Sequence, residues 1–226
     1  MSPPDRAIDT PAKGSREAWL DAAFELLLES GVDSVRILSL AKRLRLSRTS
    51  FYWFFKDREA LLEALIERWR EKNTRGLVRQ SEAYAESIVE AMLNVFDCWL
   101  DPRLFDAQLE FAMRSWALQS AAVAREIDAA DAARIEALTR MFIAHGHEEL
   151  AANVRGRTIY LTQIGYISMK TRESLEVRMA RIPAYVEIFT GQSPTERELQ
   201  RFHARHGYAR HGYARHGYAR HGYSRT

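Results

Sequence analysis

A short cationic stretch, residues 34–58, holds the side chains with the clearest capacity for chemistry. It contains seven arginines and lysines and a single carboxylate, Asp57, whereas the whole chain of 226 residues has a formal net charge of only +3. Arg48, Thr49 and Ser50 lie in its middle, and their guanidinium and hydroxyl groups suit phosphate oxygens and base edges. The residue types and the local charge therefore predict a surface that contacts a phosphate backbone.

Two short helices joined by a tight turn are expected to carry these residues. Leu38, Ala41 and Leu44 recur every three residues and give the first helix one apolar face. Residues 45–46 form the turn, and Ser47 can cap the second helix by accepting a backbone N–H bond. Helix, turn and capped helix in this order are typical of a helix-turn-helix.

The second short helix is predicted to run through Phe54, and Asp57 repeats the cap for a longer helix over residues 58–78. Its apolar spacing stops at Trp69, so the polar remainder is interpreted as a linker between two cores. Phe51, Phe54 and Phe55 are expected in the core, because aromatic residues at helical spacing usually pack.

The rest of the chain also follows helical periodicity, which predicts an all-α fold. Helices are expected over residues 15–30, 81–100, 103–119, 123–145, 149–170, 175–190 and 194–203. Pro183 is expected to break or restart one of them. Gly156 and Gly165 would allow another helix to approach closely. No strand pattern bounded by hairpin signals is found, so a sheet is not expected.

Sites of other kinds have weak support. Cys98 lies in an apolar helix without a partner motif and is expected to be a core thiol, and one cysteine excludes an internal disulfide. His145 and His147 flank Gly146, where a turn is a simpler explanation than a metal site. We therefore expect no catalytic residue, metal or cofactor, no membrane span, and a cytoplasmic protein.

Residues 22–65 closely resemble the DNA-binding domain of the TetR family of bacterial transcriptional regulators. The resemblance rests on Gly31 after the first helix, Leu40-Ala41, the turn Arg45-Leu46-Ser47, Tyr52 to Phe55, and Arg58-Glu59-Ala60-Leu61. The family usually has glycine at position 45 and lysine at position 58. An arginine at position 45 would cost about 1 kcal/mol if the turn needs a positive φ.

The resemblance implies that the second short helix enters the DNA major groove. Arg48 would bind guanine and Thr49 a thymine methyl group, while Tyr52 and Arg58 would bind phosphates. Lys42, Arg43 and Arg45 are interpreted as a solvated face. The full predicted DNA-binding set is Arg36, Ser47, Arg48, Thr49, Ser50, Tyr52, Trp53, Lys56 and Arg58.

The resemblance also implies a homodimer that binds a palindromic operator, most commonly a repressor, released by a small apolar or amphipathic effector. The predicted effector pocket is Trp99, Phe105, Phe111, Met113, Trp116, Met141, Phe142 and Tyr160, although these residues could fill an ordinary core. The predicted dimer interface is Ile159, Thr162, Gln163, Tyr166, Tyr185 and Ile188.

Four segments follow from this interpretation: a flexible arm over 1–14, the helix-turn-helix domain over 15–62, the effector and dimerisation domain over 63–203, and a tail over 204–226. The tail repeats Arg-His-Gly-Tyr-Ala, which is interpreted as disordered low complexity and alternatively as a metal- or nucleic-acid-binding tail. The rival to a regulator is an enzyme, or a helical interaction module or scaffold without sequence-specific DNA binding.

Overall fold

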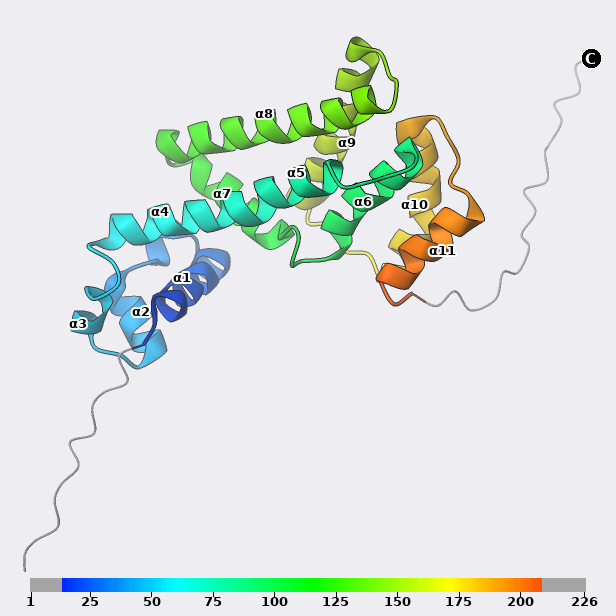
Figure 1. Cartoon of the computed structure of the whole chain (residues 1–226). Coiled ribbons are helices and arrows are strands. Elements are labelled where there is room, and N and C mark those ends of the chain that lie inside the picture. Colours follow the sequence, from blue (N-terminus) through cyan, green and yellow to red (C-terminus); the bar gives the residue numbers. More distant parts are fainter. Residues whose placement is uncertain (1–13, 209–226) are drawn as a thin grey trace, which may run out of the picture.

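The structure, a computed structural model, describes residues 14–208, and every regular element within that range is a helix. The expectations for the arm over 1–13 and the repeats over 209–226 lie outside the described residues. The α-helices are α1 (Arg16–Ser30), α2 (Ile37–Leu44), α3 (Arg48–Phe51), α4 (Arg58–Trp69), α5 (Gly76–Ser81), α6 (Ile88–Leu100), α7 (Ala107–Ala117), α8 (Ala121–Ala144), α9 (Glu149–Ser168), α10 (Leu175–Thr190) and α11 (Glu196–Arg205) (Figure 1).

The first three helices form a small head at one end of the molecule (Figure 1). Aromatic side chains fill its core, where the Trp19 and Phe51 rings meet edge to face at 5.3 Å and Phe55 stacks on Phe51. The three predicted caps are confirmed, since Ser15, Ser47 and Asp57 each accept a backbone N–H bond. The expected core role of the aromatic residues is also confirmed.

The second short helix is shorter than predicted. Regular α-helix ends at Phe51, and the chain continues to Phe55 through hydrogen-bonded turns in which the Phe54 and Phe55 N–H groups both donate to the Phe51 carbonyl. The Phe51 side chain is fully buried. These turns carry Tyr52 and Trp53 to the surface immediately after α3.

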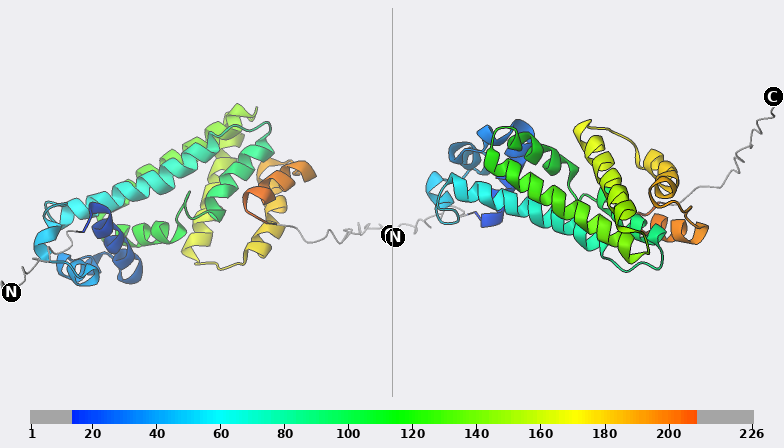
Figure 2. Two further views of the ribbon diagram at one scale, coloured as in Figure 1. Left: turned by 60° about the horizontal axis from the view of Figure 1, so that its bottom comes forward. Right: turned by 90° about the horizontal axis from the view of Figure 1, so that it is seen from above.

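One continuous rod runs from α4 into α5, with a π-helical segment, η2 (Arg70–Arg75), between them. Both views of Figure 2 show α8 lying alongside this rod. The polar sequence after Trp69 does lie between two cores, because Trp69 packs in the head cluster and Leu77 in the bundle cluster. The segment is not exposed throughout, since Asn73 is fully buried and Asn73 and Thr74 find polar partners on α7 and α8.

The remaining helices form the larger bundle, with several boundaries different from those predicted. The chain between α5 and α6 is irregular, so the helix predicted from residue 81 begins after its cap Ser87. Likewise α7 begins after Asp106, which accepts bonds from two backbone N–H groups. Pro183 does not interrupt α10, and the ring is accommodated inside the helix.

Two glycines permit close contacts between elements. A Cβ on Gly76 would lie 2.2 Å from the Leu104 carbonyl oxygen, so the start of α5 can meet the loop before α7 only without a side chain. Gly156 of α9 lies against Thr139 of α8, as predicted. Gly165 faces open space in the described chain, so the close approach predicted there is not found.

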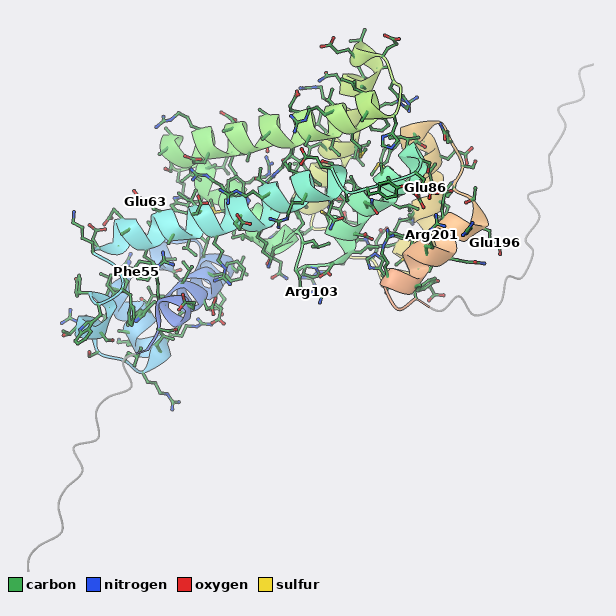
Figure 3. All side chains as sticks on the ribbon, viewed as in Figure 1. Phe55, Glu63, Glu86, Arg103, Glu196 and Arg201 are labelled. Carbon is green, nitrogen blue, oxygen red and sulfur yellow. The ribbon has the colours of Figure 1, made fainter. Side chains whose placement is uncertain are left out.

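The last helix packs against α6 at the end of the molecule opposite the head. Figure 3 shows Arg201 of α11 near Glu86 at that end, far from Phe55 in the head. The first repeat residues are ordered, in contrast to the expected boundary at residue 204. His206 lies 2.7 Å from the Asp97 carboxylate, and the Tyr208 ring packs edge to face on His203.

Arg45 ends α2 in the left-handed conformation, with φ of 54° and ψ of 38°. Because a side chain disfavours this region, replacing Arg45 by glycine removes backbone strain from the folded state. Glycine also gives the unfolded chain more entropy, which opposes this gain, so Arg45→Gly should raise the free energy of unfolding by a net amount of about 0.5–1 kcal/mol. Urea unfolding of the full chain measures it.

Lys42→Gly is the matched control, because it places glycine inside the same helix and should lower stability by about 1 kcal/mol. If Arg45→Gly is as destabilising as Lys42→Gly, then the proposed strain at position 45 is absent.

Candidate nucleic-acid interface and effector cavity

The N-terminal turn of α3 presents polar side chains to solvent. Arg48 and Thr49 are exposed, and neither side chain has a hydrogen bond or ion pair within residues 14–208. Ser50 is half-buried and its hydroxyl donates to the Ser47 carbonyl at 2.8 Å. Ser47 itself caps the helix through its hydroxyl. Two exposed side chains, Arg48 and Thr49, are thus available to a partner, while the two serines shape the helix start.

A second exposed group follows α3 directly. Tyr52 and Trp53 are 59% and 64% exposed, although the Tyr52 ring also packs edge to face against buried Phe51. Lys56 is exposed next to them. The structure therefore brings together on one end of the head seven of the nine predicted residues, namely Ser47, Arg48, Thr49, Ser50, Tyr52, Trp53 and Lys56.

Arg58, which was predicted to bind a phosphate, makes hydrogen bonds within the head. Its guanidinium donates to the backbone carbonyls of Val35 at 2.6 Å and Val32 at 2.9 Å. These two bonds tie the start of α4 to the segment before α2. Arg36 also donates to a backbone carbonyl, from Nε to that of Asp33 at 2.8 Å, yet its side chain remains exposed.

The other cations of the head divide into two kinds. Arg43 binds Glu25 at 3.0 Å and pairs through both terminal nitrogens with Glu29, so it fastens α2 to α1. Lys42 and Arg45 are exposed. The interpretation of these three residues as a solvated charged face holds for Lys42 and Arg45, whereas Arg43 has a structural role.

A cavity of about 730 Å³ lies between the head and the bundle. Leu27, Leu28, Gly31 and Val32 form its wall on the head side. The bundle contributes α7, the C-terminal part of α9, and the loop into α10. The bundle residues in the wall are Trp99, Ala107, Gln108, Phe111, Ala112, Ser115, Trp116, Gln119, Gln163, Tyr166, Ile167, Lys170, Thr171, Arg172, Glu173 and Arg178.

Three residues of the predicted effector pocket, Trp99, Phe111 and Trp116, line this cavity. The other five are core residues. Met113 packs in the head cluster, whereas Phe105, Met141, Phe142 and Tyr160 pack in the bundle cluster. Sequence reasoning missed the head-side wall because apolar residues on α1 look like ordinary core.

Five of the predicted dimer residues line a small cavity of about 40 Å³ next to the first, namely Ile159, Thr162, Gln163, Tyr166 and Tyr185. The Tyr166 and Tyr185 hydroxyls lie 2.7 Å apart. Ile159 is fully buried in the core of its own chain, so the prediction that it contacts a second subunit was wrong.

Only Ile188 of the predicted set is open, at 70% exposure. The outer face of α9 instead carries Leu150, Val154 and Leu161, which are all exposed. Their spacing of four and seven residues puts them on one side of the helix. The predicted residues on α9 lie on the side of the helix that faces the bundle, and apolar residues occur on both sides.

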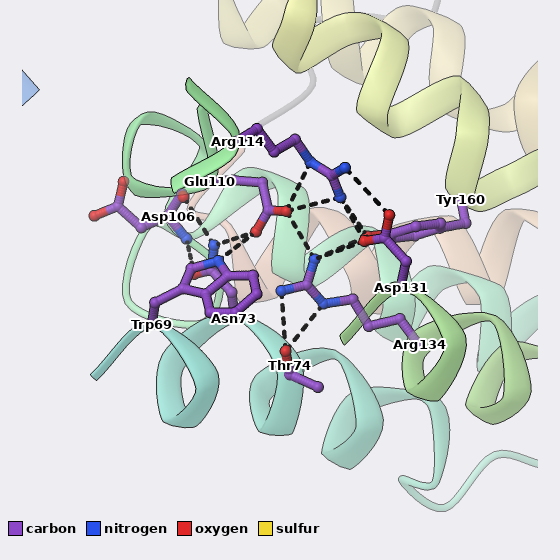
Figure 4. A network of polar contacts seen from close by, with 9 residues as sticks. All are labelled: Trp69, Asn73, Thr74, Asp106, Glu110, Arg114, Asp131, Arg134 and Tyr160. Atoms are coloured by element: carbon purple, nitrogen blue, oxygen red, sulfur yellow. Dashed lines mark hydrogen bonds and ion pairs between the residues drawn. The ribbon is translucent and has the colours of Figure 1, made fainter. Parts of the chain in front are cut away.

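A buried polar network joins the rod to the bundle (Figure 4). Glu110 of α7 is completely buried, and its carboxylate accepts bonds from Trp69 at 2.7 Å, Asn73 at 3.0 Å, Arg114 at 3.0 Å and Arg134 at 2.9 Å. These partners come from α4, the π-helical segment, α7 and α8, so one carboxylate connects four elements.

The network extends to α9 through Tyr160. Arg134 is also completely buried and donates to the Tyr160 hydroxyl at 2.8 Å and to Thr74, while Tyr160 donates to Asp131 at 2.6 Å. Burial would raise the pKa of the Glu110 carboxyl, but the Arg134 charge outweighs it and holds that pKa below its ordinary value. Both Glu110 and Arg134 are therefore charged at neutral pH.

The sequence could have suggested this network. Glu110 and Arg114 are four residues apart, the spacing of an ion pair on one helix face, and Glu110 stands between Leu109 and Phe111. Asn73 lies one turn beyond Trp69. Nothing in the sequence, however, indicated that Arg134 would come to the same place.

No group of three or more metal-ligating side chains is found among residues 14–208. His145 bonds the Met141 carbonyl, and the His147 ring packs edge to face on Phe142. Cys98 is fully buried, and burial raises the pKa of its thiol to about 12, which suits a core thiol. In the same range, none of the helices is long and apolar enough to cross a membrane.

The helices of the head define a helix-turn-helix domain, and comparisons with known proteins agree. Residues 20–65 match the family described as "Bacterial regulatory proteins, tetR family". The chain is 39% identical over 74 residues to tetracycline repressor protein class G of Vibrio anguillarum, covering 32% of this chain and 35% of the relative. It is 43% identical over 54 residues to tetracycline repressor protein class D of Escherichia coli, covering 24% of this chain and 25% of the relative. The matches thus span about a third or less of these relatives' length.

Solved structures extend the likeness to the whole fold. AmtR of Mycobacterium smegmatis superposes with a TM-score of 0.57 at 16% identity, over 88% of this chain and 97% of that one. A transcriptional regulator of Rhodococcus sp. Rha1 gives a TM-score of 0.53 at 17% identity, over 84% and 97%. The all-α fold with its N-terminal helix-turn-helix is confirmed, and residues 20–65 of the head are similar to the TetR family of bacterial regulatory proteins.

Truncating Glu110 would leave Arg134 charged and unpaired in the interior. Glu110→Ala should therefore lower the free energy of unfolding by about 3–5 kcal/mol, measured by thermal and urea unfolding. Glu136→Ala, on the exposed side of α8 where Glu136 pairs with Arg140, is the control and should change it by less than about 0.5 kcal/mol. Equal effects of the two substitutions would contradict a central role for the buried carboxylate.

Proposed function

We propose that the protein is a transcriptional repressor that binds a palindromic DNA operator as a homodimer through α3, and that a small effector releases it. The observation that carries this proposal is the exposure of Arg48 and Thr49 on a capped helix whose other side is fixed in the head core by Phe51. Binding at an operator implies a location in the bacterial cytoplasm.

In this proposal Arg48 and Thr49 contact base edges in the major groove, with Ser47 and Ser50 at the start of the helix. Tyr52 and Trp53 flank the groove, with the Tyr52 hydroxyl on a phosphate, and Lys56 and Arg36 add backbone contacts. Arg58 is a positioning residue, because its bonds to Val32 and Val35 hold α4 against the head.

Dimerisation is proposed through the outer faces of α9 and α10. Leu150, Val154 and Leu161 on α9 and Ile188 on α10 are exposed large apolar side chains on neighbouring helices. A second copy related by a two-fold axis would bury them and place the two heads side by side. Two heads on one side are what a palindromic operator requires, with half-sites about 34–36 Å apart.

The effector is proposed to bind in the cavity between the head and the bundle. A volume of about 730 Å³ falls in the range of small-molecule sites. Because α1 and Val32 form one wall, an occupant contacts the head directly. A ligand that fits one head orientation better than another shifts the population between DNA-binding and released states.

The rival, a helical interaction module without DNA selectivity, receives no support from the relatives, which are regulators. Tetracycline is named only for the relatives, and the matches span about a third or less of their length.

Arg48→Ala should weaken binding to the preferred operator by about tenfold to a hundredfold per half-site and relax base preference, because a bidentate contact to guanine is lost. Operators selected from random duplexes and fluorescence anisotropy over a range of salt concentrations measure this. Tyr52→Phe should weaken binding to all duplexes alike, since only a phosphate contact is lost.

Arg43→Ala is the matched control, because the same charge is removed from a side chain that faces Glu25 and Glu29. It should leave base preference unchanged. The assignment of base reading fails if Arg48→Ala keeps the wild-type preference.

Leu161→Glu and Ile188→Glu should convert the dimer to a monomer at about micromolar concentration, because carboxylates would face each other across the two-fold axis. Sedimentation velocity of the full chain measures the mass. Leu118→Glu is the control, since Leu118 is the most exposed large apolar residue of the described chain and lies away from α9 and α10. A dimer that survives both substitutions would contradict this interface.

A further inference from the structure

The charges in the wall of the large cavity are unbalanced. Lys170, Arg172 and Arg178 contribute cations, whereas Glu173 is the single carboxylate in the wall. Glu173 is already paired with Arg181 outside this cavity. An occupant of the cavity therefore meets an excess of positive charge.

Arg178 is the most informative of these cations. It stands near the start of α10, half-buried, in the walls of both cavities. Its guanidinium has no hydrogen bond or ion pair with any residue of the described chain. Burial lowers its pKa, and Glu173 and Tyr166 only partly offset this. A partly desolvated guanidinium without a partner is costly, and an anion in the cavity would relieve that cost.

Lys170 is held in the wall by an unusual backbone conformation. Its φ is 52°, and only one other non-glycine residue of the described chain, Arg45, has a positive φ. The side chain lies over the Phe111 ring, with Nζ 4.1 Å from the ring centroid. Strained residues of this kind occur often at ligand clamps. Lys170 thus presents a second cation beside an aromatic surface.

The remaining wall is aromatic and apolar. Trp99, Phe111 and Trp116 line it from the bundle, and Leu27 and Leu28 line it from α1. These aromatic and aliphatic side chains suit the body of an apolar molecule. Gln163 and Tyr166 of α9 are neutral polar residues that line both the large and the small cavity.

We propose that the cavity binds a small carboxylate with an apolar body, whose carboxylate pairs with Arg178 and Lys170 while its body packs against Trp99, Phe111 and Trp116. This inference names the class of effector and therefore rests on the proposed function for its regulatory meaning. The binding itself does not depend on DNA.

The same site explains how such a ligand would act on the head. Val32 lines the cavity, and its carbonyl accepts a bond from Arg58 at the start of α4. An occupant that displaces Val32 would disturb this bond and with it the attachment of α4 to the segment before α2. The carboxylate end would meanwhile be held by α9 and α10, so the ligand would span head and bundle.

The test compares probes that differ only in charge. Octanoate and 4-phenylbutyrate, with their amides and the corresponding amines, are titrated against the full chain by calorimetry and tryptophan fluorescence. We expect at least one carboxylate to bind about tenfold or more tightly than its amide, and the amine to bind least, because a charge-assisted bond is lost and then replaced by repulsion.

Arg178→Gln should reduce carboxylate affinity about tenfold to a hundredfold and leave the amide nearly unchanged. Arg125→Gln, on the exposed surface of α8 away from the cavity, is the matched control and should bind like wild type. Lys170→Met is the second variant, with the same direction of change, so that a misfolded Arg178→Gln protein would not prevent the test.

Equal binding of carboxylate and amide, a preference for the amine, or no binding of any carboxylate up to about 10 mM would overturn the inference. The operator assay is run separately on the same protein. Selective DNA binding without a carboxylate preference defeats only this inference, whereas carboxylate binding without selective DNA binding defeats only the proposed function.

Discussion

The carboxylate of Glu110 is the point at which the rod of α4 and α5, the short helix α7 and the long helix α8 are joined. It is completely buried and accepts bonds from Trp69, Asn73, Arg114 and Arg134. Such a group is tolerated only because every partner is in place, since an unpaired buried charge is strongly destabilising. The relative positions of the four elements are therefore closely specified by one polar cluster rather than by apolar packing alone.

This constraint also explains the position of the head. The head core continues through Trp69 into Leu109 and Met113 of α7 and into the start of α8. The head is consequently packed on the bundle over a broad apolar surface, and the large cavity opens beside that surface rather than inside the bundle. Any ligand there lies at the junction through which the head must move.

The sequence predicted the head well because its signals are local. Caps at Ser15, Ser47 and Asp57, and apolar spacing within α1 and α2, each depend on residues a few positions apart. The turn motif indicated position 45 as the place where a positive φ could be needed, and Arg45 has a φ of 54°. The hydrogen bonds of Arg58 were not predicted, because its acceptors at positions 32 and 35 are far away in the sequence.

The bundle was predicted less well, for a matching reason. Its elements were correctly predicted to be helices. The lining of the cavity and the outer side of α9, however, depend on which neighbouring helix each face contacts. Ile159 and Leu161 are two positions apart and equally apolar, yet one is fully buried and the other is exposed. Periodicity cannot separate them when apolar residues surround the helix.

The π-helical segment determines how far the head is rotated relative to the bundle about the axis of the rod formed by α4 and α5. A π turn closes its hydrogen bond over one residue more than an α turn, so the rod contains a local surplus of chain between Trp69 and Gly76. Loss of one residue there would restore ordinary α pairing and rotate everything on one side by about 100° relative to the other. Asn73 would then point away from Asp106 and Glu110. The rotation of the head about the axis of the rod is thus set by the number of residues in this segment. An insertion or deletion that a solvent-exposed helix end would tolerate would here turn the head relative to the bundle.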